Sequence, residues 1–332
     1  MDKSAHRVLR GWPRWSASLA ALWVGATWLA AAIAAEAPGA PGSGSAWTTG
    51  AKQGLGTSVT PGSKVWYTLG QGITHEVYYP QVDTPNVQDL QFIVTDGSAF
   101  VDLERDATDH QVQLVDPSAL IYRQINTAHS GKYRITKTYL TDPDRSTLLI
   151  DTRFEALSGG PYQLYVLYNP SLNGSGLGDT AASQGDALVA SDGHVASALM
   201  VSGGFSQRSS GSSSDGLVDL NADKRLDNRF DSASAPGNIV QIGQLNVGSD
   251  TDITLALGFG QNRLEALANA QISLATPFSA HQAKYADGWH GYLAALRPAP
   301  NSRRAGSIRG RTVLCLGSLI APGGSPIMLA RN

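Results

Sequence analysis

Residues 65–97 most constrain what this chain can fold into, because they hold three strand-like runs in succession. The runs Val65 to Leu69, Ile73 to Tyr79 and Leu90 to Thr95 are rich in β-branched and aromatic residues, and each is bounded by Gly, Pro, Asn or Asp. Similar alternation, with turn signals at intervals of roughly 8 to 15 residues, continues to Leu257. The sequence therefore predicts an all-β fold in which about a dozen strands or more form stacked antiparallel sheets.

The composition is that of a globular protein. The 332 residues are 42% hydrophobic and 16% charged, and the 36 glycines agree with a fold that has many turns. Acidic residues outnumber basic ones, 27 to 25, so we expect no nucleic-acid partner. Cys315 is the only cysteine, which excludes an intrachain disulfide.

Residues 1–34 have the pattern of a secretory signal peptide. Four basic side chains precede an apolar run from Leu19 to Ile33, and a small-x-small site lies before Ala35. The alternative is a retained anchor helix, but an apolar run of about 15 residues is short for a bilayer. We therefore predict a secreted or periplasmic protein with no retained membrane anchor. The Pro/Gly/Ser-rich residues 35–46 are predicted to form a flexible linker, with order beginning near Trp47.

The period changes from strand to helix after Asn262. Apolar residues then recur at helical spacing, which predicts a β-domain over residues 47–277 and a connector helix over residues 278–297. The helical stripe consists of Tyr285, Trp289, Tyr292, Leu293 and Leu296. Residues 298–332 contain five arginines and no acidic residue, and we interpret them as an anomalous basic tail, either frameshifted or disordered.

Two polar stretches interrupt the strand pattern, at residues 173–186 and 207–231, and are interpreted as loops on functional or interdomain surfaces. The second contains an acidic series that resembles the start of a calcium loop, at Asp219, Asn221 and Asp223. Lys224 and Phe230 occupy the positions at which an EF-hand has Gly and Glu, so an EF-hand is excluded while looser calcium binding stays open. The histidines show no zinc spacing, and we predict no other cofactor.

Six acidic residues in the strand-rich segment could in principle supply the carboxylate pair of a glycoside hydrolase. We interpret them instead as solvated or turn-forming, so no independent active site is predicted. His75 and Glu76 are interpreted as a surface pair on a strand. The six carboxylates are Glu76, Asp83, Asp89, Asp96, Asp102 and Glu104.

Aromatic side chains give the candidate contact site. Tyr78 and Tyr79 should point to opposite faces of one strand, so one of them is expected to be exposed beside Pro80 and Asp83. We predict that this rim faces a catalytic domain or its substrate cleft, with simple packing as the alternative. Trp66 and Trp289 are interpreted as core residues. The candidate contact residues are Tyr78, Tyr79, Asp83 and, in the acidic loop, Asp219.

Several segments together resemble the N-terminal domain of prokaryotic glycoside hydrolase family 15 enzymes, the bacterial glucodextranase and glucoamylase group. The resemblance runs from about Trp47 to Leu296. Its most specific segments are G-A-K-Q-G-L-G-T-S (50–58), V-W-Y-T-L (65–69), E-V-Y-Y-P (76–80), D-L-Q-F-I-V-T-D-G (89–97), Y-R-I-T-K-T-Y-L-T-D-P (133–143), Y-N-P-S-L-N-G-S-G (168–176) and S-D-G-L-V-D-L (214–220). Leu217 departs from the pattern, where an aromatic residue is expected.

This resemblance implies a galactose mutarotase-like β-supersandwich that precedes an (α/α)6 catalytic barrel carrying two catalytic glutamates. The barrel has no counterpart in this sequence, so no catalytic residue is carried over. The implied function is a non-catalytic N-terminal module of an exported α-glucan hydrolase, with starch or dextran and the catalytic domain as partners. The alternative is a stand-alone secreted carbohydrate-binding or structural protein.

Overall fold

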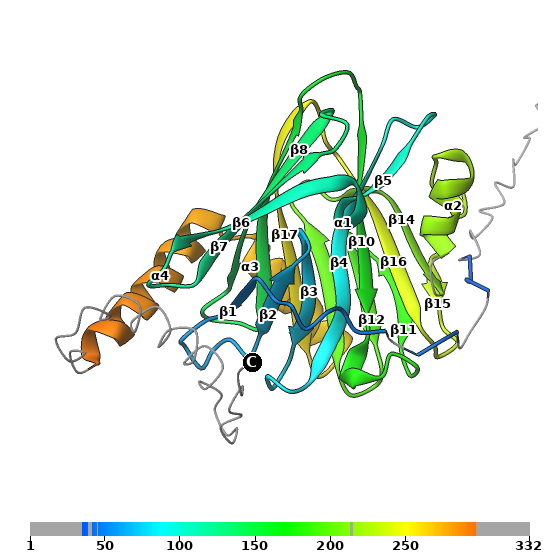
Figure 1. Cartoon of the computed structure of the whole chain (residues 1–332). Helices are drawn as coiled ribbons and strands as arrows, with labels where there is room; N and C mark the ends of the chain where they lie inside the picture. Colours follow the sequence, from blue (N-terminus) through cyan, green and yellow to red (C-terminus); the bar gives the residue numbers. More distant parts are fainter. Residues whose placement is uncertain (1–34, 39–41, 45, 213–214, 297–332) are drawn as a thin grey trace, which may run out of the picture. The chain divides into compact units, whose positions relative to one another are not determined.

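A computed structural model describes residues 35–38, 42–44, 46–212 and 215–296 (Figure 1). The predicted signal peptide and basic tail lie outside these residues. Strands dominate the described part of the chain, and every pairing between its named strands is antiparallel. The strands form two sheets, of eight and nine strands within the described ranges. The prediction of an all-β fold with stacked antiparallel sheets is confirmed.

The eight-stranded sheet has the order β1-β2-β3-β4-β10-β16-β14, with β5 paired to β4. Its strands are β1 Gly54–Thr57, β2 Trp66–Gly70, β3 Ile73–Tyr78, β4 Pro85–Thr95, β5 Val101–Leu103, β10 Gln163–Pro170, β14 Phe205–Ser212 and β16 Ile239–Leu245. Residues 54–57, which precede the first predicted strand, also belong to this sheet because they pair with β2.

The nine-stranded sheet has the order β15-β11-β12-β13-β17-β9-β8-β7-β6. Its strands are β6 Thr108–Asp116, β7 Ile121–Ala128, β8 Tyr133–Thr141, β9 Thr147–Ala156, β11 Thr180–Gln184, β12 Ala187–Ser191, β13 Ala196–Val201, β15 Ser232–Ala233 and β17 Asp250–Gly260. The chain first passes from the eight-stranded to the nine-stranded sheet through the one-turn helix α1 Glu104–Ala107, and it crosses between the sheets several more times after β9.

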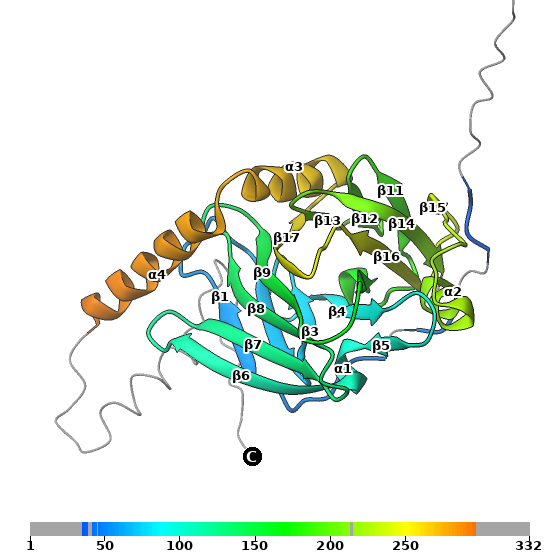
Figure 2. The ribbon, with the colours of Figure 1, turned by 90° about the horizontal axis from the view of Figure 1, so that it is seen from above.

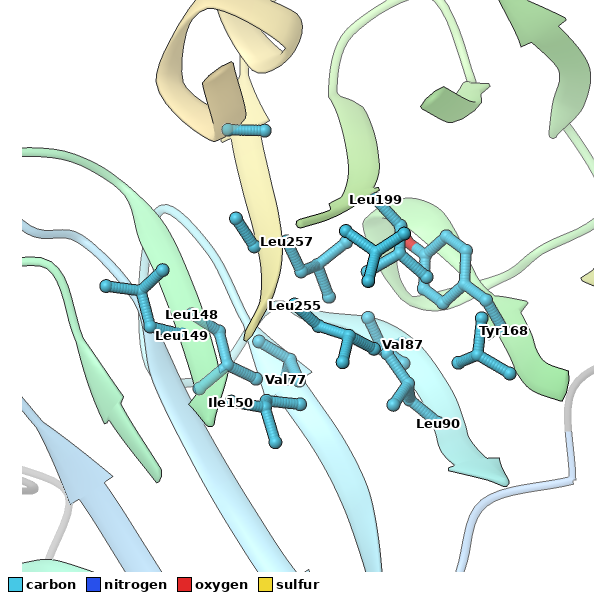
Figure 3. Packing of buried hydrophobic residues seen from close by; sticks show 14 of the residues in the cluster. Val77, Val87, Leu90, Leu148, Leu149, Ile150, Tyr168, Leu199, Leu255 and Leu257 are labelled. Atoms are coloured by element: carbon cyan, nitrogen blue, oxygen red, sulfur yellow. The ribbon is translucent and has the colours of Figure 1, made fainter. Parts of the chain in front are cut away.

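The main core lies between the two sheets. Val77, Val87 and Leu90 of the eight-stranded sheet meet Ile150 and Leu255 of the nine-stranded sheet, and each of these side chains is almost fully buried (Figure 3). Such interdigitation of two inner faces is the usual core of stacked sheets. A second, smaller cluster lies on the other face of the eight-stranded sheet, under helix α2 Asp215–Asp223.

Helix α3 Arg263–Leu274 covers part of the nine-stranded sheet (Figure 2). The Asn262 side chain caps it by accepting a hydrogen bond from the Glu265 backbone N–H at 3.0 Å. Gly258 of β17 allows the close approach, since a Cβ atom there would lie 2.5 Å from the Ala266 carbonyl oxygen. The change from strand to helix after residue 262 was thus predicted correctly.

Helix α4 Phe278–Ala295 corresponds to the predicted connector helix. Tyr285 and Trp289 are buried, as the helical stripe predicted, and both donate to the Thr57 carbonyl oxygen at 2.7 and 2.9 Å. The helix is therefore fastened to the edge strand β1. No helix in the described ranges is long and apolar enough to span a bilayer.

Three loop predictions are corrected by the structure. Residues 173–186 contain strand β11, and residues 207–231 contain most of β14 and all of α2. Residues 35–37, predicted as flexible linker, are bound to the β15 region: the Ala37 N–H donates to the Ser232 carbonyl oxygen at 2.7 Å, and the Glu36 carboxylate accepts from Ser232 Oγ at 2.6 Å. Backbone and carboxylate hydrogen bonds hold this segment without any need for large apolar side chains.

Candidate functional site

Two neighbouring strands of the eight-stranded sheet are bulged at the same level. Between regular pairs of β2 with β3, the single residue Thr68 lies opposite both His75 and Glu76. Between its pairs with β10, strand β4 likewise has one extra residue, Gln88, next to Asp89. A bulge redirects side chains locally and is common beside functional sites. These two bulges place polar side chains on the face of the sheet that points away from the main core.

We call this group the outer-face cluster and define it as His75, Glu76, Asp89, Gln91 and Asn169. Its members come from the three adjacent strands β3, β4 and β10, and Asp89 pairs directly with Asn169 across the β4–β10 register. His75, Glu76, Asp89 and Gln91 are each at most 6% exposed. The cluster is therefore a polar site that is largely enclosed and held in place by the pairing of three strands.

Glu76 is the anchor of the chain segment that precedes β1. Its carboxylate accepts hydrogen bonds from the Thr48 backbone N–H at 3.0 Å and from the Thr48 hydroxyl, and it pairs with the Lys52 ammonium group. Burial would raise the pKa of Glu76, but the hydrogen bonds from Lys52 and Thr48 outweigh burial and lower it. Glu76 is therefore ionised and fully engaged.

His75 is completely buried beside this ion pair. Burial and the nearby Lys52 charge lower the pKa of His75 to about 4, so the imidazole is neutral at neutral pH. Its Nδ1 lies 3.1 Å from Lys52 Nζ, and because an ammonium group only donates, Nδ1 accepts. The prediction of a surface pair is wrong for both His75 and Glu76, since the bulge and the preceding segment enclose them.

Asp89 lies in the middle of the cluster. Its two carboxylate oxygens accept from Gln91 Nε2 at 3.0 Å and from Asn169 Nδ2 at 3.3 Å. Burial raises the pKa of Asp89, although these two hydrogen bonds and the charge of Arg105 act in the opposite direction. Two atoms of the cluster, His75 Nε2 and Asn169 Oδ1, are buried and have no hydrogen-bond partner in the structure.

The predicted aromatic rim is divided between two places. Tyr78 lies half-buried beside the cluster, pairs with Trp66 across β2–β3, and has its pKa raised to about 12 by burial and by Glu76. Tyr79 is only 5% exposed and stacks on Phe259, with ring centroids 5.5 Å apart. The two tyrosines do separate to opposite faces, but neither is fully exposed.

Tyr79 also borders an open hollow of about 390 Å³ at the end of the sandwich. The hollow lies between the β3–β4 turn and the β12–β13 turn. Its lining consists of Lys64, Tyr79, Pro80, Gly193, His194, Val195 and Gln261. Asp83 is exposed in the β3–β4 turn, where its carboxylate accepts from the Thr84 hydroxyl at 3.3 Å, and it does not line the hollow.

Asp219 organises the acidic loop from within. It lies on α2, is 8% exposed, and accepts hydrogen bonds from the Asp227 and Asn228 backbone N–H groups at 2.7 and 2.8 Å. Asn221 and Asp223 lie on the same helix. Within the described ranges, no three His, Cys, Asp or Glu side chains are grouped as a metal site would require. Calcium binding by this loop stays a prediction that calorimetric titration can test.

The other predicted carboxylates have structural partners. Asp96 forms a turn by accepting from the Ser98 and Ala99 N–H groups, as predicted. Asp102 accepts from the Tyr133 hydroxyl at 3.1 Å. Asp89 and Glu104 were predicted to be solvated or turn-forming, and this is wrong for both: Asp89 is only 6% exposed, and Glu104 is fully buried, 2.8 Å from Lys137 Nζ.

Sequence reasoning missed Lys52, Gln91 and Asn169 as members or partners of the site. Their spacing carries no motif, because they meet only through strand pairing and two bulges. The one available signal is the local polarity of His75 and Glu76 inside an otherwise apolar strand.

Comparison with known proteins agrees with this architecture. The family model described as "Glucodextranase, domain N" matches residues 37–294. A glucoamylase from Clostridium sp. (strain G0005) is 34% identical over 264 residues, which are 77% of this chain and 37% of that protein.

Solved structures also match this chain over most of its length. The crystal structure of a bacterial glucoamylase complexed with acarbose superposes with a TM-score of 0.79 at 31% identity, covering 86% of this chain and 43% of the other. A putative kojibiose phosphorylase from the human microbiome, at 10% identity and a TM-score of 0.52, shares the fold, covering 80% of this chain and 39% of the other. The chain thus spans about two fifths of the length of these relatives. Because the family model matches well over half of its residues, this chain belongs to the glucodextranase N-domain family.

Proposed function

We propose that residues 47–296 act as the non-catalytic N-terminal module of an exported glucoamylase-type α-glucan hydrolase. The observation that carries the proposal is the match of the whole β-domain and α4 to the N domain of this family and to a glucoamylase structure. In this role the module packs against a catalytic domain and stabilises it.

The state of the carboxylates supports a non-catalytic role. Inverting hydrolysis needs an acid and a base roughly 6.5–9.5 Å apart, with both free to reach the sugar and its water. Glu76, Asp89 and Glu104 are instead buried and held by ion pairs or hydrogen bonds. None of these three carboxylates is free to act on a substrate.

Helix α4 supplies a surface for the catalytic domain. Its buried face is docked on β1, whereas Tyr292 and Leu293 are only partly buried and Leu296, just beyond its end, is 36% exposed. Partly exposed apolar side chains at the end of a helix are suited to an interdomain contact. The hollow beside Tyr79 is the second surface that we assign to this contact or to glucan.

Two measurements test the module role. We expect the purified chain to release no glucose from malto-oligosaccharides, and to raise the thermal inactivation temperature of the separately produced catalytic region of the Clostridium glucoamylase. Glucose release by the chain alone would contradict the proposal. Absence of any stabilisation, together with retention on insoluble starch or dextran, would favour the alternative of a stand-alone binding protein, which the polar hollow supports.

Export is part of the same proposal and rests on the basic and apolar pattern of residues 1–34. Mass spectrometry of material recovered from the periplasm or medium should give Ala35 as the first residue. Recovery of uncleaved chain in the cytoplasm would refute export.

A further inference from the structure

We propose that the outer-face cluster binds a neutral, hydroxyl-bearing ligand, a glucose unit, and that residues 46–53 form a cover over this site. We call residues 46–53 the arm. The choice of glucose rests on the proposed function, whereas the existence of the site rests on the polar atoms described below.

The cluster presents one unused donor and one unused acceptor. Since His75 Nδ1 accepts from Lys52, the proton of the neutral imidazole is on Nε2, and that N–H has no acceptor among the described residues. Asn169 directs its Nδ2 to Asp89, so its unpartnered Oδ1 is a free acceptor. Buried polar groups are nearly always paired, so two unpaired ones on β3 and β10, the strands on either side of β4, point to a missing partner.

Gly70 of β2 leaves space for the His75 imidazole. A Cβ atom on Gly70 would lie 2.5 Å from His75 Cε1, so no larger residue fits at position 70 without displacing the imidazole. The bulge in β3 then places His75 and Glu76 side by side. A β-bulge redirects a side chain, and a glycine in a strand allows another group to approach closely. Together they fix the position of the His75 imidazole, which an ordinary surface strand does not require.

The charges of the site favour a neutral ligand. The Glu76 and Asp89 carboxylates repel an anion, while Lys52 and Arg105 disfavour a cation. A hydroxyl group both donates and accepts, so separate hydroxyl groups of one ligand can pair with the His75 Nε2–H group and with Asn169 Oδ1. A sugar has several such groups, whereas a water molecule has one oxygen.

The arm is held in a way that allows it to move. It crosses in front of β3 and β4 (Figure 1), and every described residue in it is exposed or half-buried. The Gln53 N–H donates to the Leu69 carbonyl oxygen of β2. The other hydrogen bonds between the arm and the β2–β3 hairpin are made by Thr48, Lys52 and the Gln53 side chain. When the arm opens, water can replace these polar partners of Lys52, Thr48 and Glu76, so the net cost of losing each hydrogen bond is modest. The arm can therefore open without unfolding the sheet.

Lys52→Ala is the most informative variant. It removes the contacts to Glu76 and His75, so the open state becomes more populated and the apparent affinity for sugar should rise, by about tenfold if the arm is mostly closed. We would titrate maltose and isomaltose into the ¹⁵N-labelled chain and follow the amide shifts of β3, β4 and β10. A purely structural role for Lys52 predicts lower stability with no gain in sugar affinity.

Two further variants and a control complete the test. His75→Phe keeps the ring and removes Nε2, and should abolish binding; if it does not fold, the half-buried Asn169→Ala should weaken binding at least about fivefold, the loss of one neutral hydrogen bond. Leu264→Ala, at a 76% exposed position of α3 on the nine-stranded sheet, should bind as the wild type does. Shifts confined to the hollow, or no saturable shift in any variant, would overturn the proposal and leave only an ordered water at the cluster. The same variants should still stabilise the catalytic region, so failure of sugar binding is distinguishable from failure of the proposed function.

Discussion

His75 makes part of the stability of the fold depend on pH. Its pKa is lowered to about 4 in the folded chain, against about 6.5 for an unperturbed histidine. Between these values the unfolded chain binds more protons than the folded one, so stability is complete above pH 6.5 and falls as the pH drops toward 4. We expect His75→Gln to flatten this decline, as measured by urea unfolding at pH 7 and pH 4.5. An equal decline in wild type and variant would assign it to other groups.

Asp179 should make the stability of the fold depend on pH in the opposite direction to His75. Burial raises the pKa of Asp179 to about 7, although its Oδ2 accepts from the Leu172 N–H at 2.9 Å; its other oxygen has no hydrogen-bond partner in the described part of the chain. Between about 3.8 and 7 the folded chain then binds more protons than the unfolded one, so this group's contribution falls as pH rises through that window. Relative to Asp179→Asn, the wild type should therefore lose stability from pH 5 to pH 8. A pH-independent difference would show that Asp179 does not titrate there.

At the scale of elements, the docking of α4 depends on one carbonyl group. Thr57 O accepts from both Tyr285 and Trp289. Tyr285→Phe removes one donor only and should lower the free energy of unfolding by about 1 kcal/mol, whereas Trp289→Ala also empties a buried indole site and should cost about 3–5 kcal/mol. Urea unfolding with far-UV circular dichroism measures both. Equal effects of the two substitutions would mean that the helix is not anchored through this face.

The elements with strong periodicity were predictable, and the weakly patterned ones were not. The helical stripe identified the buried face of α4, and β-branched alternation located most strands. Strand β14, with the sequence FSQRSSGS, lies in a stretch whose pattern predicts a loop, because small polar residues have low strand propensity. It is a strand because β16 pairs with it over residues 205–212, a tertiary contact that sequence pattern does not contain.

The candidate site was predictable only in part for the same reason. Tyr78 was expected to face away from Tyr79, and it does. The burial of His75 and Glu76 depends on an extra residue in β3 relative to β2, and such a bulge shifts the inward and outward alternation by one position. None of the residue types at this position is characteristic of a bulge. The sequence therefore predicts that His75 and Glu76 are exposed, whereas the fold buries both.

At the scale of the molecule, one buried ion pair joins the two sheets. Lys137 of β8 lies in the nine-stranded sheet, and its ammonium group donates to the Gly72 carbonyl oxygen in the β2–β3 turn at 2.8 Å. Its partner Glu104, on the crossover helix α1, accepts from the Phe92 N–H of β4 at 3.0 Å and from Asn126 Nδ2 of β7. Both side chains are at most 1% exposed. The pair therefore links α1 with both sheets at the point where the chain first crosses between them.

Removing one charge of this pair should be far more harmful than removing both. Lys137→Met leaves the Glu104 carboxylate buried without its counter-ion, and breaking such a pair typically costs about 3–5 kcal/mol. Adding Glu104→Gln to that variant removes the orphaned charge while an amide oxygen can still accept from Phe92, so the double variant should recover part of the loss. Unfolding in urea at pH 7, followed by tryptophan fluorescence, gives the four free energies of the cycle. If Lys137→Met alone stays within about 1 kcal/mol of wild type, the sheets are held together by apolar packing and the ion pair does not tie them.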